Sequence, residues 1–212
     1  AVVAGNPSGA PNHVTGVEAL EAGTSSFAIA DSAGNVASIT STIESGFGSG
    51  LVVNGYYLNN ELTDFSFVPS VDGVAVANAV AGGKRPRSSM SPMIVTGPDG
   101  RVRLAVGAAG GATIPAQVLK AIIGVIDWKL SAQDAIAQPV IFAPSGPTIY
   151  VEADSPLEAM VPALTALGHG MIKTRPHGTF KANAIESVAD SDGRGRWVGA
   201  ADPRSEGVAV AQ

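Results

Sequence analysis

The chain has 212 residues, a formal net charge of −5, 45% apolar residues and only 15% charged residues. This length is ample for one hydrophobic core, and the low charged fraction indicates either a surface partly covered by a partner or a Gly/Ala-rich globular protein. The acidic balance argues against nucleic-acid binding, and the absence of cysteine excludes disulfides, thiolate metal sites and a cysteine nucleophile.

The first 23 residues are rich in Gly, Ala, Pro and Asn and show no sustained hydrophobic period. This composition predicts a linker or tail without the regions of a secretory signal, and an ordered domain that begins near Thr24. No apolar run reaches the roughly 18 to 20 residues that cross a bilayer, so no membrane span is expected in this chain.

Residues 27–31 and 36–42 are apolar and β-branched, and the turn-forming run 32–35 joins them. The pattern predicts a β-hairpin that places Thr24 and Thr42 on neighbouring strands. Further on, an extended segment is expected at 51–58, a polar turn with aromatic anchors at 59–67, and a long loop at 68–83.

A second hairpin is predicted around the turn at 97–100, with strands at 93–95 and 102–107. Apolar spacing predicts helices over 113–129 and 131–138. The capping box Ser155-Pro156-Leu157-Glu158 predicts a third helix that ends near Leu167, before Gly168. Later strands are expected at 171–174, 184–189 and 196–200. Strand pairs around a block of helices, with no regular βαβ alternation, predict an α+β layered domain.

Thr24 heads a β-like run and is the candidate nucleophile. A hydroxyl nucleophile needs a base beside it. A terminal threonine carries its own base, an α-amine with a reference pKa of roughly 7.7 to 8.0. The hypothesis therefore requires scission between Gly23 and Thr24.

Eight motifs, in this order, resemble the small subunit of the γ-glutamyltranspeptidase family. The similarity covers Thr24 to about Ser205. The motifs are Thr24-Ser25-Ser26 with Asp31, Gly34-Asn35, Thr40-Ser41-Thr42, Phe47-Gly48-Ser49-Gly50, Leu58-Asn59-Asn60-Glu61-Leu62-Thr63-Asp64-Phe65, Lys84-Arg85-Pro86-Arg87-Ser88-Ser89-Met90-Ser91-Pro92, Gly110-Gly111 and Asp202-Pro203-Arg204-Ser205.

The resemblance implies an N-terminal-nucleophile hydrolase with a four-layer αββα sandwich, of which this chain would form the C-terminal half. Such enzymes are precursors that cut themselves into a large and a small subunit. Residues 1–23 would be the tail of the large-subunit part or a linker before the cleavage site, and residues 24–212 the small-subunit catalytic domain. The implied partner is the large subunit, in a heterodimer, and a periplasmic or extracellular location is favoured over a cytoplasmic one.

The resemblance also implies catalytic roles. Thr24 would attack the substrate, Thr42 would hydrogen-bond the nucleophile, and the amides of Gly110 and Gly111 would form an oxyanion hole. The family usually has Ser-Pro before this glycine pair and Ser-Arg after it. Here Ala108-Ala109 and Ala112-Thr113 replace them, so the hydrogen bonds next to the loop are expected to differ from the family pattern.

Substrate-binding roles follow from the same resemblance. Ser88 and Ser89 would bind the α-carboxylate of a glutamyl group, together with an arginine of the large subunit, and Glu61 and Asp64 would hold its α-ammonium group. Glu44 stands where the well-known transpeptidases carry asparagine. Its carboxylate either strengthens the grip on the ammonium group or turns away, with a change in donor specificity.

The leading hypothesis is a γ-glutamyl hydrolase or transferase that cleaves glutathione-like amides through a threonyl acyl-enzyme, with water or an amine as acceptor. The first alternative is an acylase of the same superfamily that accepts glutaryl or other short acyl groups, like the cephalosporin acylases. The second is an unprocessed, inactive relative with a binding role. No cofactor is expected, and no metal, since His13, His169 and His177 lack metal-ligand spacing.

Overall fold

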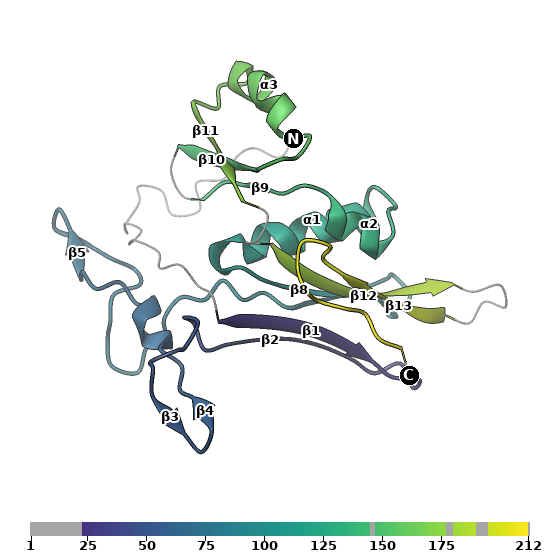
Figure 1. The fold of residues 1–212 in the computed structure, drawn as a ribbon, viewed down its shortest axis with the longest axis horizontal. Coiled ribbons are helices and arrows are strands. Elements are labelled where there is room, and N and C mark those ends of the chain that lie inside the picture. Colours follow the sequence, from purple (N-terminus) through teal and green to yellow (C-terminus); the bar gives the residue numbers. More distant parts are fainter. Residues whose placement is uncertain (1–22, 145–146, 177–179, 190–194, 212) are drawn as a thin grey trace.

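A four-stranded antiparallel sheet in the order β13-β12-β8-β7 forms the centre of the fold (Figure 1). The computed structural model describes residues 23–144, 147–176, 180–189 and 195–211. The four strands are β7 (Met93–Thr96), β8 (Val102–Ala109), β12 (Lys181–Ala189) and β13 (Gly195–Ala201). The predicted turn at 97–100 is confirmed, because the Gly97 amide donates to the Arg101 carbonyl at 2.8 Å.

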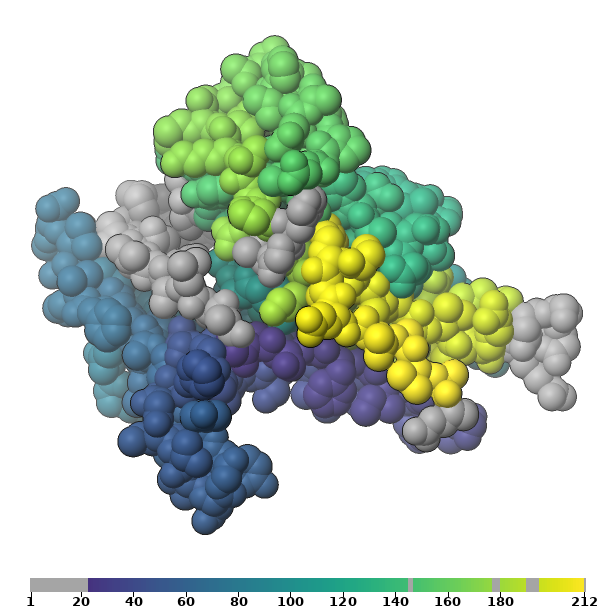
Figure 2. Space-filling model, in the orientation of Figure 1, coloured from purple at the N-terminus to yellow at the C-terminus, as the bar shows by residue number. Residues whose placement is uncertain are grey.

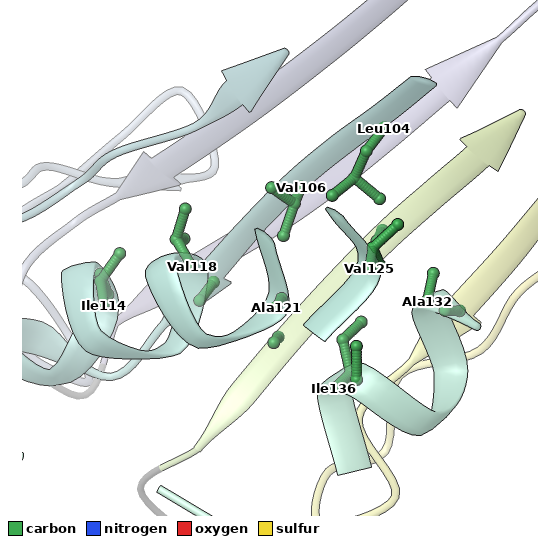
Figure 3. Close-up of a cluster of buried hydrophobic side chains, with 13 residues drawn as sticks. Leu104, Val106, Ile114, Val118, Ala121, Val125, Ala132 and Ile136 are labelled. Atoms are coloured by element: carbon green, nitrogen blue, oxygen red, sulfur yellow. The ribbon is translucent and has the colours of Figure 1, made fainter. Parts of the chain in front are cut away.

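The two predicted helices after Thr113 and Ser131 are present, and they cover one face of this sheet. A short 3-10 helix (Gly111–Thr113) leads into α1 (Ile114–Ile126), and α2 (Ala132–Ala137) begins after Ser131, whose hydroxyl accepts from the Asp134 amide. Apolar side chains of both helices interdigitate with those of β8 and its neighbours in one buried cluster (Figure 3). The labelled members of this cluster are Leu104, Val106, Ile114, Val118, Ala121, Val125, Ala132 and Ile136.

The predicted first hairpin, β1 (Thr24–Ala30) and β2 (Val36–Thr42), packs on the opposite face of the sheet (Figure 1). Strand alternation turns Leu104, Val106 and Ala108 toward the helices, so the small residues of β8 between them face the hairpin. A Cβ built on Gly107 would lie 2.3 Å from the Ser26 hydroxyl oxygen. The two sheets therefore approach closely because β8 carries glycine here.

The described residues thus form three successive layers, which are helices, sheet and hairpin. Three apolar side chains on the outer face of the hairpin remain exposed: Phe27 at 44%, Ile29 at 56% and Ile39 at 42%. This face is apolar enough to be covered by a further layer. The α+β class is confirmed, and the three layers are those of an αββα sandwich that lacks its outer helices.

The prediction of one extended segment over 51–58 is wrong. The segment is a tight hairpin of β3 (Val52–Val53) and β4 (Tyr56–Tyr57), with positive φ at Asn54 and Gly55. Asn-Gly is the pair that favours this two-residue turn.

The predicted loop over 68–83 contains a second hairpin of the same kind, β5 (Ser70–Val71) and β6 (Val74–Ala75). It turns at Asp72 and Gly73, which also have positive φ. Asp-Gly favours the same turn as Asn-Gly, so the sequence carried a signal here that the loop prediction missed.

The third helix begins later than the capping box predicted. The Ser155 hydroxyl donates to the Glu152 carbonyl at 2.7 Å, and residues 155–158 form a turn before a 3-10 helix (Glu158–Met160). The α-helix itself, α3 (Val161–Ala166), starts with Pro162 in its first turn. Gly168, at φ 99°, follows the helix as expected.

Helix α3 joins two parallel strands that form a small sheet of their own. The strands β10 (Thr148–Glu152) and β11 (Met171–Arg175) pair in parallel, and β9 (Ile141–Phe142) pairs antiparallel with β10. The expected strand at 171–174 is confirmed, whereas β9 and β10 were not predicted. The described residues therefore include one βαβ unit, and they show no regular alternation of this kind.

A buried charge network joins this small sheet to the central one. Arg204 donates to Glu152 at 2.6 Å and to Asp202 at 2.7 Å, and its guanidinium also reaches the Ile136 carbonyl at 2.7 Å. Lys120 donates to the carbonyls of Ile136 and Gln138, both at 2.5 Å. Burial, followed by the nearby Arg204 charge, lowers the pKa of Lys120 to about 8. The motif Asp202-Pro203-Arg204-Ser205 thus closes the fold around the end of α2.

Two features are absent from the described ranges of the chain. No helix in them is long and apolar enough to cross a bilayer. The same ranges hold no group of three or more His, Cys, Asp or Glu side chains arranged to bind a metal ion.

Candidate active site

Thr24 and Thr42 lie directly opposite each other at the open end of the β1–β2 hairpin. The Thr24 hydroxyl donates to the Thr42 hydroxyl oxygen at 2.9 Å, and the same oxygen accepts from the Glu44 amide at 2.8 Å. Thr24 is 8% exposed. Thr24 and Thr42 are opposite residues on neighbouring antiparallel strands, and the hydrogen bond between their side chains fixes the rotamer of Thr24.

The peptide bond that precedes Thr24 is held in the same ladder. The Gly23 carbonyl accepts from the Ile43 amide at 3.2 Å, and the Gly23 amide donates to the Glu44 carbonyl at 2.8 Å. A Cβ on Gly23 would lie 2.5 Å from the Ser45 carbonyl oxygen and 2.8 Å from Ile43 Cγ1. The backbone here approaches its neighbour so closely that only glycine fits.

Gly110 and Gly111 follow directly on the last residue of β8. Both have positive φ, 124° and 60°, so the chain turns sharply out of the sheet and into the helical segment. Ala109, just before them, lines the same cleft as Thr24. The glycine loop therefore lies at the end of the strand against which the hairpin packs.

Glu44 is a buried carboxylate in a conformation that glutamate rarely adopts. It is 2% exposed, has φ 71°, and accepts a short hydrogen bond from the Asn60 side-chain amide. Asparagine tolerates this left-handed region better than glutamate does. The side chain turns toward Asn60, which directly precedes the loop that carries the other two acids.

Asn60 connects the segment after β2 with the acidic turn. Its side-chain oxygen accepts from the Ser45 amide at 3.1 Å and from the Ser45 hydroxyl at 3.0 Å, and its amide group donates to the Thr63 hydroxyl at 2.9 Å. Asn60 precedes the 3-10 helix Glu61–Asp64. These bonds hold Glu44 close to the two predicted ammonium ligands.

Glu61 and Asp64 both have raised pKa values. Burial is the main cause for Glu61, followed by the charge of Asp64, their mutual hydrogen bond and the charge of Glu44. Burial is also the main cause for Asp64, followed by the charge of Glu44, while the hydrogen bond from Glu61 and the Arg87 charge oppose the shift. The three acids form a strongly negative site that a bound cation would relieve.

Asn78 links this acidic turn to the two predicted carboxylate ligands. Its side-chain amide donates to the Asp64 carbonyl at 2.5 Å, and its side-chain oxygen accepts from the Arg87 amide at 2.9 Å. Ser88 and Ser89 follow Arg87 directly, and the Ser88 hydroxyl accepts from the Met90 amide at 3.2 Å. Within the described ranges, no hydrogen bond joins either serine to Thr24 or Thr42.

A cleft of about 1340 Å³ runs between β1, the first half of β12, β13 and the C-terminal segment 204–211. Figure 2 shows this segment, in yellow, beside the purple hairpin. Of the predicted site residues, only Thr24 lines the cleft. It is therefore not the pocket for an amino-acid head group, whose expected ligands lie on the loops after β2.

Three asparagines near the site were missed by sequence reasoning. Asn60 and Asn78 anchor the loops described above, and Asn183 lines the cleft with a buried side-chain oxygen that lacks a hydrogen-bond partner among the described residues. Asn60 lies within the Asn-Asn-Glu motif, which drew attention to its acids instead. Nothing in the local sequence around Asn78 or Asn183 marks either residue.

Comparison with known proteins places these features in a family context. The model of the gamma-glutamyltranspeptidase family matches residues 7–212. The glutathione hydrolase proenzyme of Bacillus subtilis strain 168 is 36% identical over 193 residues, which cover 90% of this chain and 31% of that protein. The chain thus spans about a third of the length of this curated relative.

Two further relatives extend the comparison. The Acylase ACY 1 proenzyme of Pseudomonas sp. strain SE83 is 34% identical over 192 residues, covering 90% of this chain and 32% of that protein. The structure of the gamma-glutamyltranspeptidase from Pseudomonas nitroreducens, complexed with L-DON, matches with a TM-score of 0.75 and 36% identity. The match covers 88% of this chain and 98% of the matched chain.

Proposed function

We propose, since the chain belongs to the gamma-glutamyltranspeptidase family, that it is the nucleophile-bearing part of a γ-glutamyl hydrolase or transferase. The observation that carries the proposal is the 2.9 Å hydrogen bond from the Thr24 hydroxyl to Thr42, at the head of β1. This hydrogen bond holds the Thr24 hydroxyl beside the Gly23–Thr24 peptide bond, whose cleavage would give Thr24 a free amine.

Cleavage before Thr24 would be the first step. The Thr24 hydroxyl oxygen adds to the Gly23 carbonyl carbon, the carbon–nitrogen bond breaks, and the threonine nitrogen takes up the proton. Water then hydrolyses the resulting ester, which leaves a carboxylate on Gly23 and a free amine on Thr24. The Ile43 amide, which already donates to the Gly23 carbonyl oxygen, would stabilise negative charge on that oxygen. Residues 1–23 then belong to the upstream part, and residues 24–212 are the catalytic domain.

Turnover would use the same oxygen a second time. The freed α-amine, with a reference pKa of roughly 7.7 to 8.0, accepts the proton of the Thr24 hydroxyl as it attacks the γ-carbonyl carbon of the substrate. The leaving amine takes that proton, and a threonyl ester remains. Water or an acceptor amine then releases the γ-glutamyl group. Thr42 orients the nucleophile, and the amides of Gly110 and Gly111 stabilise the oxyanion.

The acidic site supports a glutamyl rather than a glutaryl substrate. Burial, followed by the negative charge of neighbouring acids, raises the pKa values of Glu61 and Asp64, and Glu44 contributes to both shifts. An α-ammonium group placed among them would offset this negative charge, whereas a glutaryl group brings no positive charge. Ser88 and Ser89 would bind the α-carboxylate, since Asn78 ties their segment to Asp64.

The exposed outer face of the β1–β2 hairpin supports a heterodimer. Phe27, Ile29 and Ile39 form an apolar surface where an αββα sandwich has its fourth layer. The remaining two thirds of the curated relatives' length would supply that layer as the large subunit, together with the arginine expected at the substrate carboxylate.

A direct test combines intact mass with kinetics. The purified protein should yield a species that begins at Thr24, and it should then hydrolyse a chromogenic γ-glutamyl anilide. Thr24→Ala should abolish both the cut and the turnover, while Thr24→Ser, which keeps a hydroxyl, should retain part of each. Turnover by Thr24→Ala would refute the nucleophile assignment, and a wild-type chain that is never cut would favour an inactive relative with a binding role.

An acylase is the second candidate, because an acylase proenzyme is 34% identical over 90% of this chain. Parallel assays with γ-glutamyl and glutaryl anilides separate the two functions. We expect a higher kcat/KM for the γ-glutamyl anilide. A higher value for the glutaryl anilide would assign the acylase function instead.

A further inference from the structure

Gln117, in the first turns of α1, is a fully buried amide that hydrogen-bonds to both ends of the glycine loop and to β12. Its side-chain nitrogen donates to the Ala109 carbonyl and to the Thr113 hydroxyl, both at 2.9 Å. Its side-chain oxygen accepts from the Lys181 amide at 2.9 Å. Both donor hydrogens and the acceptor of the carboxamide are therefore used, as a buried amide requires.

Thr113 passes this anchoring on to the next peptide. Its hydroxyl accepts from Gln117 and donates to the Gly110 carbonyl at 2.8 Å. The Thr113 amide also donates to this carbonyl, at 3.3 Å. The consecutive carbonyls of Ala109 and Gly110 are thus both held by the Thr113–Gln117 pair, on the side of the buried core.

Anchoring these carbonyls fixes the direction of the two amides that follow. In a trans peptide, the carbonyl and the N–H of one plane point in opposite directions. The Ala109 carbonyl therefore sets the direction of the Gly110 amide, and the Gly110 carbonyl sets that of the Gly111 amide. Glycines at φ 124° and 60° have wide conformational freedom, so the peptide between them depends on such anchors for its orientation.

We infer that Thr113 and Gln117 are positioning residues, which aim the Gly110 and Gly111 amides at the tetrahedral intermediate. The inference rests on the proposed function. In this chain, the hydroxyl of Thr113 and the amide of Gln117 supply the hydrogen bonds of the loop.

A purely structural role would have different consequences. Burying an amide and a hydroxyl costs free energy unless they are satisfied, and apolar residues would fill the same space at lower cost. The bonds from this pair hold the two carbonyls of the glycine loop. Loss of the anchoring should therefore affect the chemical step, while the ammonium ligands Glu61 and Asp64, on a separate loop, continue to set substrate affinity.

Thr113→Val and Thr113→Ser form a matched pair of variants for the test. Valine keeps the shape of threonine but removes the hydroxyl, whereas serine keeps the hydroxyl. In the processed two-subunit enzyme, we expect Thr113→Val to lower kcat for the γ-glutamyl anilide about 10- to 100-fold, with KM within about twofold of wild type. Thr113→Ser should stay within about threefold of the wild-type kcat.

Inhibitor binding gives a second measure that a merely structural role would not change selectively. A γ-boronic acid analogue of glutamate forms a tetrahedral adduct with the nucleophile and places an oxygen at the oxyanion site. Its affinity should fall in Thr113→Val by the same factor as kcat, while the affinity for glutamate stays unchanged. Equal losses in Thr113→Val and Thr113→Ser, or a rise in KM without a loss in kcat, would overturn the inference.

Structures of the wild type and Thr113→Val separate this inference from the proposed function. The peptide between Gly110 and Gly111 should turn from its wild-type orientation in the valine variant and keep it in the serine variant. If wild type lacks γ-glutamyl activity, the proposed function fails, but the orientation of this peptide still tests the anchoring. An unchanged orientation in Thr113→Val would overturn the inference, whatever the activity.

Discussion

Replacing Gly107 by alanine should weaken both the fold and the active site, because it forces the two sheets apart. The added Cβ would lie 2.3 Å from the Ser26 hydroxyl oxygen, about 1.1 Å inside the 3.4 Å at which ordinary contact begins. The φ of Gly107 is not positive, so backbone strain adds nothing to the cost of the alanine. The whole effect comes from the close approach of β8 to β1.

The size of the effect can be estimated from two opposing contributions. Overpacking of this kind costs about 1–3 kcal/mol, and the reduced freedom of the unfolded chain returns about 0.4–1 kcal/mol. A net loss of about 1–2 kcal/mol should lower Tm by about 2–8 °C in a domain of this size. Because β1 carries Thr24 at its end, a shift of about 1 Å should also lower kcat/KM about 100-fold.

Ser26→Ala provides the matched control. It removes the oxygen that the new methyl group would meet, while the Ser26 Cβ, at 3.6 Å, remains in ordinary contact. Ser26→Ala alone loses the hydrogen bonds of this hydroxyl to Thr40 and Ile39, which costs about 1 kcal/mol. The double variant should therefore be more stable and more active than the two single effects predict.

Thermal unfolding at matched scan rates and anilide kinetics check this reasoning. The four proteins of the cycle are the wild type, Gly107→Ala, Ser26→Ala and the double variant. A Gly107→Ala protein that matches wild type in both Tm and kcat/KM would refute the steric argument, and so would a double variant without recovery.

Three further predictions follow from the site and from the charge network. Glu44→Gln removes the negative charge that raises the pKa values of Glu61 and Asp64, so both should ionise at lower pH. The acidic limb of log kcat/KM should then move to lower pH than in wild type, and an unmoved limb would contradict the coupling. Because their pKa values are raised on folding, Glu61 and Asp64 affect the free energy of unfolding in the opposite sense to an ion-paired acid. Their stabilising contribution is greatest below the ordinary pKa values of 4.5 and 3.8, and it is lost as pH rises through the raised values of the folded protein. Gly23→Ala places a Cβ 2.5 Å from the Ser45 carbonyl oxygen, and a displacement of about 1 Å at the scissile bond should slow cleavage about 100-fold. Intact mass measured against time gives the cleavage rate. A Gly23→Ala protein that is cut as fast as wild type would show that the space around Gly23 is not limiting. Lys120, with a pKa lowered to about 8, binds fewer protons in the folded than in the unfolded chain between pH 8 and 10.5, so it makes stability rise with pH by up to about 1.4 kcal/mol per pH unit. Lys120→Met should remove this rise, as urea unfolding of both proteins at pH 8 and pH 10 would show, and parallel pH profiles would contradict it.

The sequence predicted the elements whose signals are local. Turn residues between apolar runs marked the β1–β2 and β7–β8 hairpins, and apolar spacing marked α1 and α2. The Asn54-Gly55 and Asp72-Gly73 turns were equally readable, but strands of two residues are too short to show an alternating pattern. The strand β9 has only two residues, too few to show alternation, and β10 pairs in parallel with β11 across α3 instead of forming a tight hairpin.

The contacts of the candidate site were less predictable. The motifs identified Thr24, Thr42 and the acidic residues, yet no local pattern shows that Gln117 hydrogen-bonds to Ala109, Thr113 and Lys181. That arrangement exists only because α1 packs across the ends of β8 and β12. The start of α3 was also misplaced, since Ser155 hydrogen-bonds back to Glu152 instead of capping a helix.

Because β1 packs against β8 and β12, the proposed cleavage would come late in folding. Thr24 meets partners that lie about 80 to 160 residues later in the chain, and such distant contacts are slow to form. A partly folded chain lacks the strands β8 and β12 against which β1, with Thr24 at its head, is packed. The cut would therefore act as a checkpoint, in which only molecules that have completed their topology release the amine and become able to react.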